Sequence, residues 1–175
     1  MAKADVEAVR LLERFGVTEP KIDPADLAQK LGVIVVQQKM TADVSGMLLR
    51  RGEEKVIGVN DAHAPVRQRF TVAHELGHLV LHRGRPLILD TGTRVNFRDS
   101  VSSMATDREE MEANRFAAAL LAPETMVRRA VREIQFTTAE GLVKELAQRF
   151  GVSATAMNYR LLNLGIISDP GDLAI

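Results

Sequence analysis

Residues 74–78 read His74-Glu75-Leu76-Gly77-His78, inside a segment at 65–82 that has the composition of a buried helix. Residues four apart on an α-helix differ by about 40° in direction and about 6 Å in height. Both imidazoles can therefore reach one metal ion at about 2.0–2.1 Å. Glu75 is rotated by about 100° and flanks such an ion, where it can accept a proton from water. The pattern predicts a zinc site with Glu75 as general base.

The competing interpretation is a chance pentapeptide on an ordinary helix. The chain has 4 histidines, and three of them fall between residues 74 and 82. Apolar side chains surround this segment and predict that it is buried, and buried imidazoles and carboxylates need partners. Gly77 costs stability in a helix interior, which predicts a close contact with another element beside the metal. These observations favour the metal site.

A small sheet is predicted before this helix. Residues 33–36 form a β-branched apolar run. Residues 46–50 and 55–59 flank a turn at residues 51–54, as in a hairpin. We therefore expect an α+β fold, in which a small, mostly antiparallel three-stranded sheet packs on a zincin-like helical core. An exposed sheet edge near Gly46 would hold an extended peptide by strand addition.

Helices are predicted in most of the remaining chain. Thr106-Asp107-Arg108-Glu109 fits a capping box that begins a helix running to Leu121. Residues 142–164 have the pattern of a helix-turn-helix pair. Residues 83–105 show no clear period and are predicted to form a loop. We expect one metallopeptidase domain at 1–175, made of a sheet and metal-binding part at 1–135 and a C-terminal helical subdomain at 136–167.

A catalytic zinc needs a third protein ligand and an open position. His82 lies about 80° round the helix from His74 and about 12 Å along it, which favours a supporting role over sharing the ion. The better donors are acids on the helix that begins at residue 107. Glu112 borders its apolar face and is the favoured ligand, with Glu109 as an alternative.

The other acids in that first turn have a simpler interpretation. Asp107 and Glu110 complement the positive end of the helix dipole, and we expect both on a solvated face. Arg67 and Arg69 are likewise expected to be solvated helix charges.

Three stretches of the chain resemble the ImmA/IrrE family of metallopeptidases. They are Val59-Asn60 with Arg69 through His82, Glu112-Ala113-Asn114-Arg115-Phe116 through Pro123, and Leu146 through Leu161, so that the resemblance covers about residues 23–165. In that family the two motif histidines and the glutamate before Ala-Asn bind zinc. The resemblance thus implies His74, His78 and Glu112 as metal ligands. Ala122 stands where the family commonly has methionine, which we expect to alter packing and not chemistry.

The resemblance also implies a function. It is that of a zinc-dependent endopeptidase, which cleaves a partner helix-turn-helix repressor and relieves repression in a stress or mobile-element response. One zinc ion is the expected cofactor, with manganese as an alternative. Tyr159 and His82 are the main candidates for stabilising the transition state, and Arg160 and His63 are further ones.

The competing function is a non-catalytic, zinc-stabilised regulator that binds DNA or a protein. Residues 154–160 would then form a recognition helix that includes Arg160. The basic side chains near it are offset by Glu140 and Glu145, and the whole chain has 23 basic and 23 acidic residues. Direct nucleic-acid binding is therefore disfavoured.

Composition restricts the location and the metal chemistry. There is no cysteine, so disulfides and thiolate metal sites are excluded. The sequence contains no long apolar run for a membrane span and begins without a secretory h-region. We expect a cytoplasmic protein, while the sequence assigns no oligomeric state.

Overall fold

The computed structural model describes residues 2–82, 86–91 and 106–168. Within these residues the fold is α+β, with seven helices and one four-stranded sheet. The helices are α1 (Lys3–Arg14), α2 (Pro24–Lys30), α3 (Pro65–Leu81), α4 (Asp107–Leu121), α5 (Glu124–Glu133), α6 (Ala139–Phe150) and α7 (Ala154–Asn163). The strands are β1 (Ile34–Gln38), β2 (Val44–Arg51), β3 (Glu54–Asn60) and β4 (Leu87–Thr91).

The sheet has the strand order β1-β3-β2-β4 and is mixed. The predicted hairpin is confirmed, because β2 and β3 pair antiparallel from Gly46↔Val59 to Arg51↔Glu54. Gly52, at φ +60°, supplies the left-handed turn residue that a two-residue connection needs. β1 runs parallel to β3, and β4 runs antiparallel to β2.

The prediction of three strands is wrong by one strand. β4 lies in the segment at 83–105 that was expected to be a loop, and residues 83–85 and 92–105 of that segment lie outside the described residues. A strand of five residues is too short to show a clear period in the sequence. Because β4 pairs with β2, Gly46 is inside the described sheet, and the edges of this sheet are β1 and β4.

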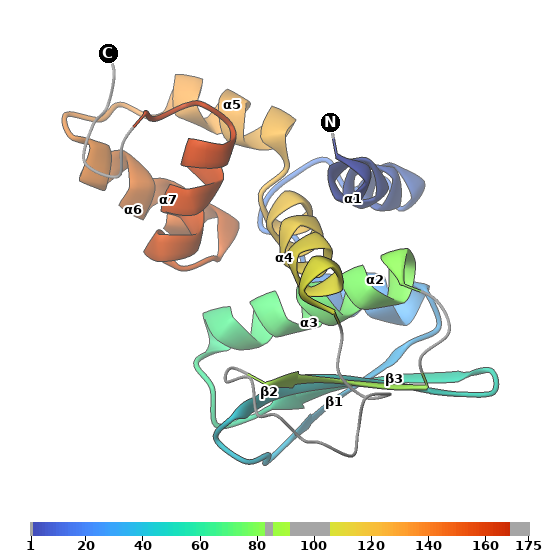
Figure 1. Cartoon of the computed structure of the whole chain (residues 1–175). Helices are drawn as coiled ribbons and strands as arrows, with labels where there is room; N and C mark the ends of the chain where they lie inside the picture. The colour runs from blue at the N-terminus through green and yellow to red at the C-terminus, as the bar shows by residue number, and fades with distance from the viewer. Residues whose placement is uncertain (1, 83–85, 92–105, 169–175) are drawn as a thin grey trace.

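The helices are arranged in layers on one face of the sheet. Figure 1 shows α3 lying between the sheet and α4, with α1 beside α4 and the group α5–α7 at one end. The middle of α3 is buried on all sides, from Thr71 to His78. The predicted apolar surround of this helix is thus confirmed. In the described part of the chain, no helix combines the length and apolar character that a membrane crossing requires.

The caps predicted from the sequence are present. Asp23 Oδ1 accepts a hydrogen bond from Ala25 N at 2.9 Å at the start of α2. Thr106 and Glu109 form the reciprocal capping box of α4, in which Thr106 N donates to Glu109 Oε2 at 2.7 Å. Because this bond occupies Glu109 at the helix start, its side chain serves the cap.

Arg69 differs from its prediction as a solvated charge. Its Nη2 donates to Ile22 O at 2.5 Å and its Nε donates to Gly151 O at 3.1 Å. Burial lowers the pKa of Arg69, and the charge of Asp23 opposes that effect. One guanidinium therefore joins α3 to the segment before α2 and to the end of α6. Arg67 is exposed, as predicted, and donates to Ser45 Oγ at 2.9 Å.

Helices α3 and α4 cross at Gly77 and Ala113. A Cβ added to Gly77 would lie 3.0 Å from Ala113 Cα and 3.1 Å from Ala113 O. The atoms in the way are backbone atoms, which cannot rotate aside. The glycine thus permits a close approach of the two backbones, and the sequence-based interpretation of Gly77 as a contact point is confirmed.

We expect Gly77→Val to lower the free energy of unfolding by about 1–3 kcal/mol, the usual cost of forcing extra methyl groups into a packed interior. Gln148→Val, at an exposed position of α6, introduces the same side chain without the clash. It should change stability by no more than about 0.5 kcal/mol. Chemical denaturation of the metal-free protein measures both, and equal effects of the two variants would contradict the close crossing.

Candidate metal centre

Helix α3 brings two imidazoles together as their spacing predicts. The Nε2 atoms of His74 and His78 are 3.0 Å apart, and the ring centroids are 4.7 Å apart. Both residues are almost fully buried, at 3% and 0% exposure. The two rings thus point their Nε2 atoms at one place inside the molecule.

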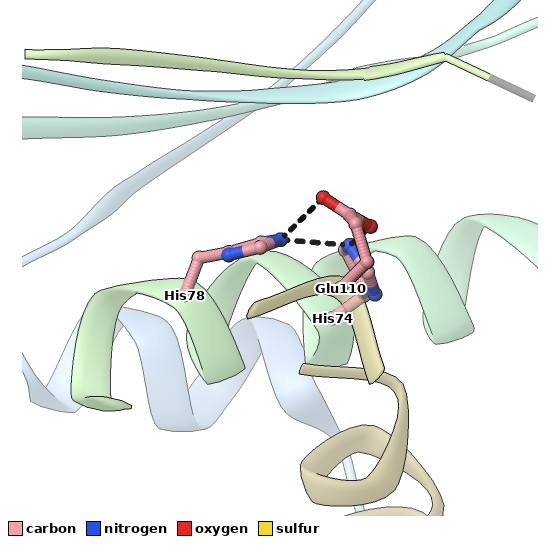
Figure 2. A group of neighbouring side chains, drawn as sticks. All are labelled: His74, His78 and Glu110. Atoms are coloured by element: carbon pink, nitrogen blue, oxygen red, sulfur yellow. Dashed lines mark hydrogen bonds and ion pairs between the residues drawn. The ribbon is translucent and has the colours of Figure 1, made fainter. Parts of the chain in front are cut away.

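Helix α4 adds a carboxylate at the same place. Glu110 Oε2 lies 3.2 Å from His74 Nε2, and Glu110 Oε1 lies 3.2 Å from His78 Nε2. Figure 2 shows the three side chains converging from the two helices. Among the described residues, these three side chains form a group that could hold a metal ion, because their ligand atoms all lie within 4.8 Å of one another.

These separations suit a single zinc ion. Four ligands at 2.0–2.1 Å in a tetrahedron lie about 3.3 Å from one another, close to the observed 3.0 and 3.2 Å. Two imidazoles and one carboxylate are also a donor set typical of catalytic zinc, with room for a fourth ligand. The residues present therefore fit the metal that the sequence predicts.

The outer nitrogens of the two imidazoles have partners of their own. His74 Nδ1 lies 3.0 Å from Asn114 Oδ1, and His78 Nδ1 lies 3.1 Å from His82 Nδ1. An amide oxygen only accepts, so His74 Nδ1 carries the proton in that hydrogen bond and Nε2 keeps its lone pair. With Nδ1 protonated on both rings, three acceptor groups face one another, an arrangement that a cation stabilises.

The glutamate beside the histidines is Glu110, and the expectation of a solvated Glu110 is wrong. Glu112, the ligand implied by the resemblance, instead lies against His82, with Glu112 Oε2 and His82 Nε2 3.0 Å apart. Residues two apart on a helix differ by about 200° in direction. Glu110 and Glu112 therefore lie on opposite sides of Ala113, where α4 meets α3. Only one of them can face His74 and His78.

Two residues that the sequence analysis missed support this centre. Asn114 is one helical turn after Glu110 and so faces the same side of α3; that spacing was the available signal. Arg50 Nη2 donates to His78 O at 2.9 Å and to His82 O at 2.7 Å. It thereby satisfies carbonyl groups at the C-terminal end of α3 and holds that end on β2. Nothing in the local sequence identifies this contact.

Burial and the contacts between the ligands shift their pKa values. Burial lowers the pKa of His78, against the opposing effect of the Glu110 carboxylate, and so favours the neutral imidazole that binds a metal. Burial raises the pKa of Glu110, but its close contact with the imidazoles of His74 and His78 outweighs this and lowers the pKa to about 2. A neutral imidazole and an ionised carboxylate are the forms that coordinate zinc.

Glu75 is fully buried between α3 and the sheet. A Cβ on Gly46 of β2 would overlap Thr71 Cγ2 and come within 3.3 Å of Glu75 Oε1. The absence of a side chain at Gly46 thus lets the strand lie directly on Glu75. Burial lowers the pKa of Arg50, and the charge of Glu75 opposes that effect.

The candidates for transition-state stabilisation lie in different surroundings. Both ring nitrogens of His82 are engaged, by His78 and Glu112, which favours a supporting role. Arg160 is buried and its Nε donates to Ala122 O at 2.9 Å. His63 is half-buried before α3, and its carbonyl accepts from Gln68 at 2.7 Å. Tyr159 is 63% exposed on α7, and its role stays a prediction.

A large cavity lies beside the centre, and His74, Glu75, His78 and Glu110 are not among the residues that line it. It has a volume of about 1100 Å³ and lies between α1, α3, α4 and the C-terminal helices. Its lining includes Phe70, Met111, Asn114 and Tyr159. Asn114 is also the partner of His74, so the cavity wall and the metal centre share a residue.

A buried helix with His-Glu-x-x-His and a carboxylate from a second helix is the arrangement of a zincin-type metallopeptidase. The chain belongs to the IrrE N-terminal-like domain family, a peptidase family whose model matches residues 28–162. The resemblance seen in the sequence is thereby confirmed.

Curated relatives share this region. The chain is 34% identical over 110 residues to the radiation response metalloprotease IrrE of Deinococcus radiodurans, which covers 62% of this chain and 31% of the relative. It is 32% identical over 102 residues to the metallopeptidase ImmA of Bacillus subtilis, and this match covers 58% of this chain and 53% of ImmA. It is 26% identical over 165 residues to immunity region protein 2 of Bacillus phage phi105, and this match covers 93% of this chain and 90% of the phage protein. The matched region thus spans about a third of IrrE and half of ImmA.

A solved structure has the same fold. A transcriptional regulator of Mycobacterium tuberculosis superposes with a TM-score of 0.62 at 21% identity, covering 93% of this chain and 47% of the other. At this identity the likeness concerns the fold alone.

The two glutamates can be distinguished by substitution. We expect Glu110→Gln to weaken zinc binding by more than the roughly 10–100-fold that follows loss of a group supporting a ligand, because it removes a charged donor. Glu112→Gln should have the smaller effect. Competition with a chromophoric chelator measures both dissociation constants. Zinc binding that survives in Glu110→Gln but not in Glu112→Gln would favour the ligand set implied by the resemblance.

Proposed function

We propose that this chain is a zinc-dependent endopeptidase in which His74, His78 and Glu110 hold one metal ion. The observation that carries the proposal is the convergence of these three donors, 3.0–3.2 Å apart, beside the buried Glu75. We propose Glu110 in place of Glu112 because Glu110 is the carboxylate that reaches both imidazoles. Manganese remains an alternative metal for the same donors.

Glu75 is the proposed general base and acid. Bound zinc would polarise the scissile carbonyl and lower the pKa of water at the site to about 7. Glu75 follows His74 directly, so its carboxylate flanks the donors without joining them. It takes the proton of the attacking water and then returns it to the leaving amine. Arg50, on the carbonyls of His78 and His82, holds this end of α3 against β2.

A polypeptide substrate suits the surroundings of the centre. β4 is an edge of the described sheet, and a peptide could add to it by main-chain hydrogen bonds. The earlier expectation of an edge at Gly46 is replaced by this strand.

The proposed substrate is a partner helix-turn-helix repressor, cut to relieve repression in a stress or mobile-element response. Support comes from the family resemblance, from relatives called a radiation response metalloprotease and a metallopeptidase, and from one called a phage immunity region protein. A repressor encoded beside this protein would be the first substrate to test.

Glu75→Gln tests the catalytic role. Loss of a general base costs typically 10²–10⁴-fold in rate, so cleavage of the repressor should fall by that factor while zinc content and thermal unfolding stay near the wild type. Glu145→Gln, an exposed acid on α6, is the matched control. Time courses on denaturing gels measure the rate, and wild-type cleavage by Glu75→Gln would reject the mechanism.

The non-catalytic regulator has less support. A recognition helix must offer basic side chains to DNA phosphates, whereas Arg160 is buried with Ala122 O and Asp5 as its neighbours. Burial lowers the pKa of Arg160, and the charge of Asp5 opposes this. The side chain that the sequence assigned to DNA thus holds α7 against the end of α4.

A further inference from the structure

A chain of side chains continues outward from the metal centre on the C-terminal side of α3. His82 Nδ1 lies 3.1 Å from His78 Nδ1, and His82 Nε2 lies 3.0 Å from Glu112 Oε2. Arg108 Nε then donates to Glu112 Oε1 at 2.9 Å. His82 is buried, whereas Glu112 is about one-third exposed, at 34%. The contacts lead from the buried ligand to the surface without a break.

The protons of this chain can be assigned in one direction. An ionised Glu112 only accepts hydrogen bonds, so His82 Nε2 carries a proton and donates a hydrogen bond to the carboxylate. In the neutral ring His82 Nδ1 is then an acceptor, and His78 Nδ1 must be the donor. His78 Nε2 is thereby left with its lone pair, directed at His74 and Glu110. Each link fixes the tautomer of the next.

We propose that His82, anchored by Glu112, is a positioning residue that fixes the ring and the tautomer of the metal ligand His78. The inference rests on the proposed metal site, in which His78 binds the ion through Nε2. It gives Glu112 a role other than the metal ligand that the resemblance implies, and it specifies the supporting role that the sequence favoured for His82. Groups that hold a ligand imidazole in this way typically contribute 10–100-fold to metal affinity.

Asn114 plays the corresponding part for His74, with Asn114 Oδ1 3.0 Å from His74 Nδ1. The two ligands are thus held differently, His74 by a neutral amide and His78 by an imidazole with a carboxylate behind it. A carboxylate at the end of the chain makes the His78 ring a stronger donor to the metal. His78 should therefore be the more sensitive of the two to changes outside the centre.

The test compares His82→Leu with His82→Asn in the full chain. Leucine removes the acceptor, whereas the Oδ1 of asparagine occupies about the place of His82 Nδ1 and can accept from His78. We expect the zinc dissociation constant to rise about 10–100-fold in His82→Leu and only a few-fold in His82→Asn. Competition with a chromophoric chelator gives the constants. Visible spectra of the cobalt-loaded proteins should show tetrahedral absorption preserved in His82→Asn and altered in His82→Leu.

Two kinds of result for the His82 variants would overturn the inference. Equal affinity of His82→Leu and the wild type would remove the positioning role, while the proposed function would stand. Equal losses in both variants, or an altered cobalt spectrum in His82→Asn, would show that the acceptor at this place is not what matters. Absence of stoichiometric zinc in the wild type would instead reject the proposed function itself.

Glu112 keeps the inference testable where His82→Leu does not fold. We expect Glu112→Leu to weaken zinc binding several-fold, because it removes the anchor of His82 and leaves α3 unchanged. Glu145→Leu, on the exposed face of α6, is the matched control and should bind zinc like the wild type. Thermal unfolding of the metal-free proteins separates lost affinity from lost folding. Unchanged affinity in Glu112→Leu would overturn the anchoring role.

Discussion

The close crossing of α3 and α4 at Gly77 and Ala113 is the constraint on which the site depends. A Cβ at Gly77 would lie 3.0 Å from Ala113 Cα, so the helices lie closer together than a side chain at position 77 would allow. Ala113 then divides the acids of α4 into two sets. Glu110 faces the pair His74 and His78, and residues on the other side of α4 face the end of α3. The crossing thus assigns one glutamate to the metal centre and the other to its support.

Burial explains why so many polar groups are linked here. An imidazole or carboxylate removed from water costs free energy unless it is hydrogen-bonded or binds a metal. The spacing of four residues from His74 to His78 and on to His82 puts three rings along one side of α3, with centroids 4.7 and 5.2 Å apart. Each ring nitrogen therefore needs a partner within reach of that side. Asn114 and Glu112 of α4 supply the outermost ones.

Much of this arrangement follows from the local sequence. The bounds of α3, its buried middle and the pair of histidines follow from Pro65, from the apolar surround and from a spacing of four. The capping box at Thr106 and the hairpin at Gly52 are equally local, because a few adjacent residues determine each of them. The choice between Glu110 and Glu112 is not local. The local pattern favoured Glu112, whereas the position of α3 brings Glu110 to the histidines. The fourth strand escaped prediction for a related reason, since pairing with β2, and not its own five residues, defines it.

Metal binding and folding should then be coupled through α4. The centre takes two donors from α3 and one from α4, so an ion bound there adds a cross-link beside the contact of Gly77 with Ala113. An ion that binds only the folded chain stabilises it in proportion to the logarithm of its concentration over the dissociation constant. Loosening of the crossing would move Glu110 away from the histidines and weaken binding of the ion. Loss of the ion would in turn remove one of the contacts that hold the two helices together. Gly77 has no side chain that could bind a metal. Substitutions at Gly77 nevertheless act on the metal-binding equilibrium, as substitutions of Glu110 do. Gly77, within the motif His-Glu-Leu-Gly-His, is in this sense part of the metal centre.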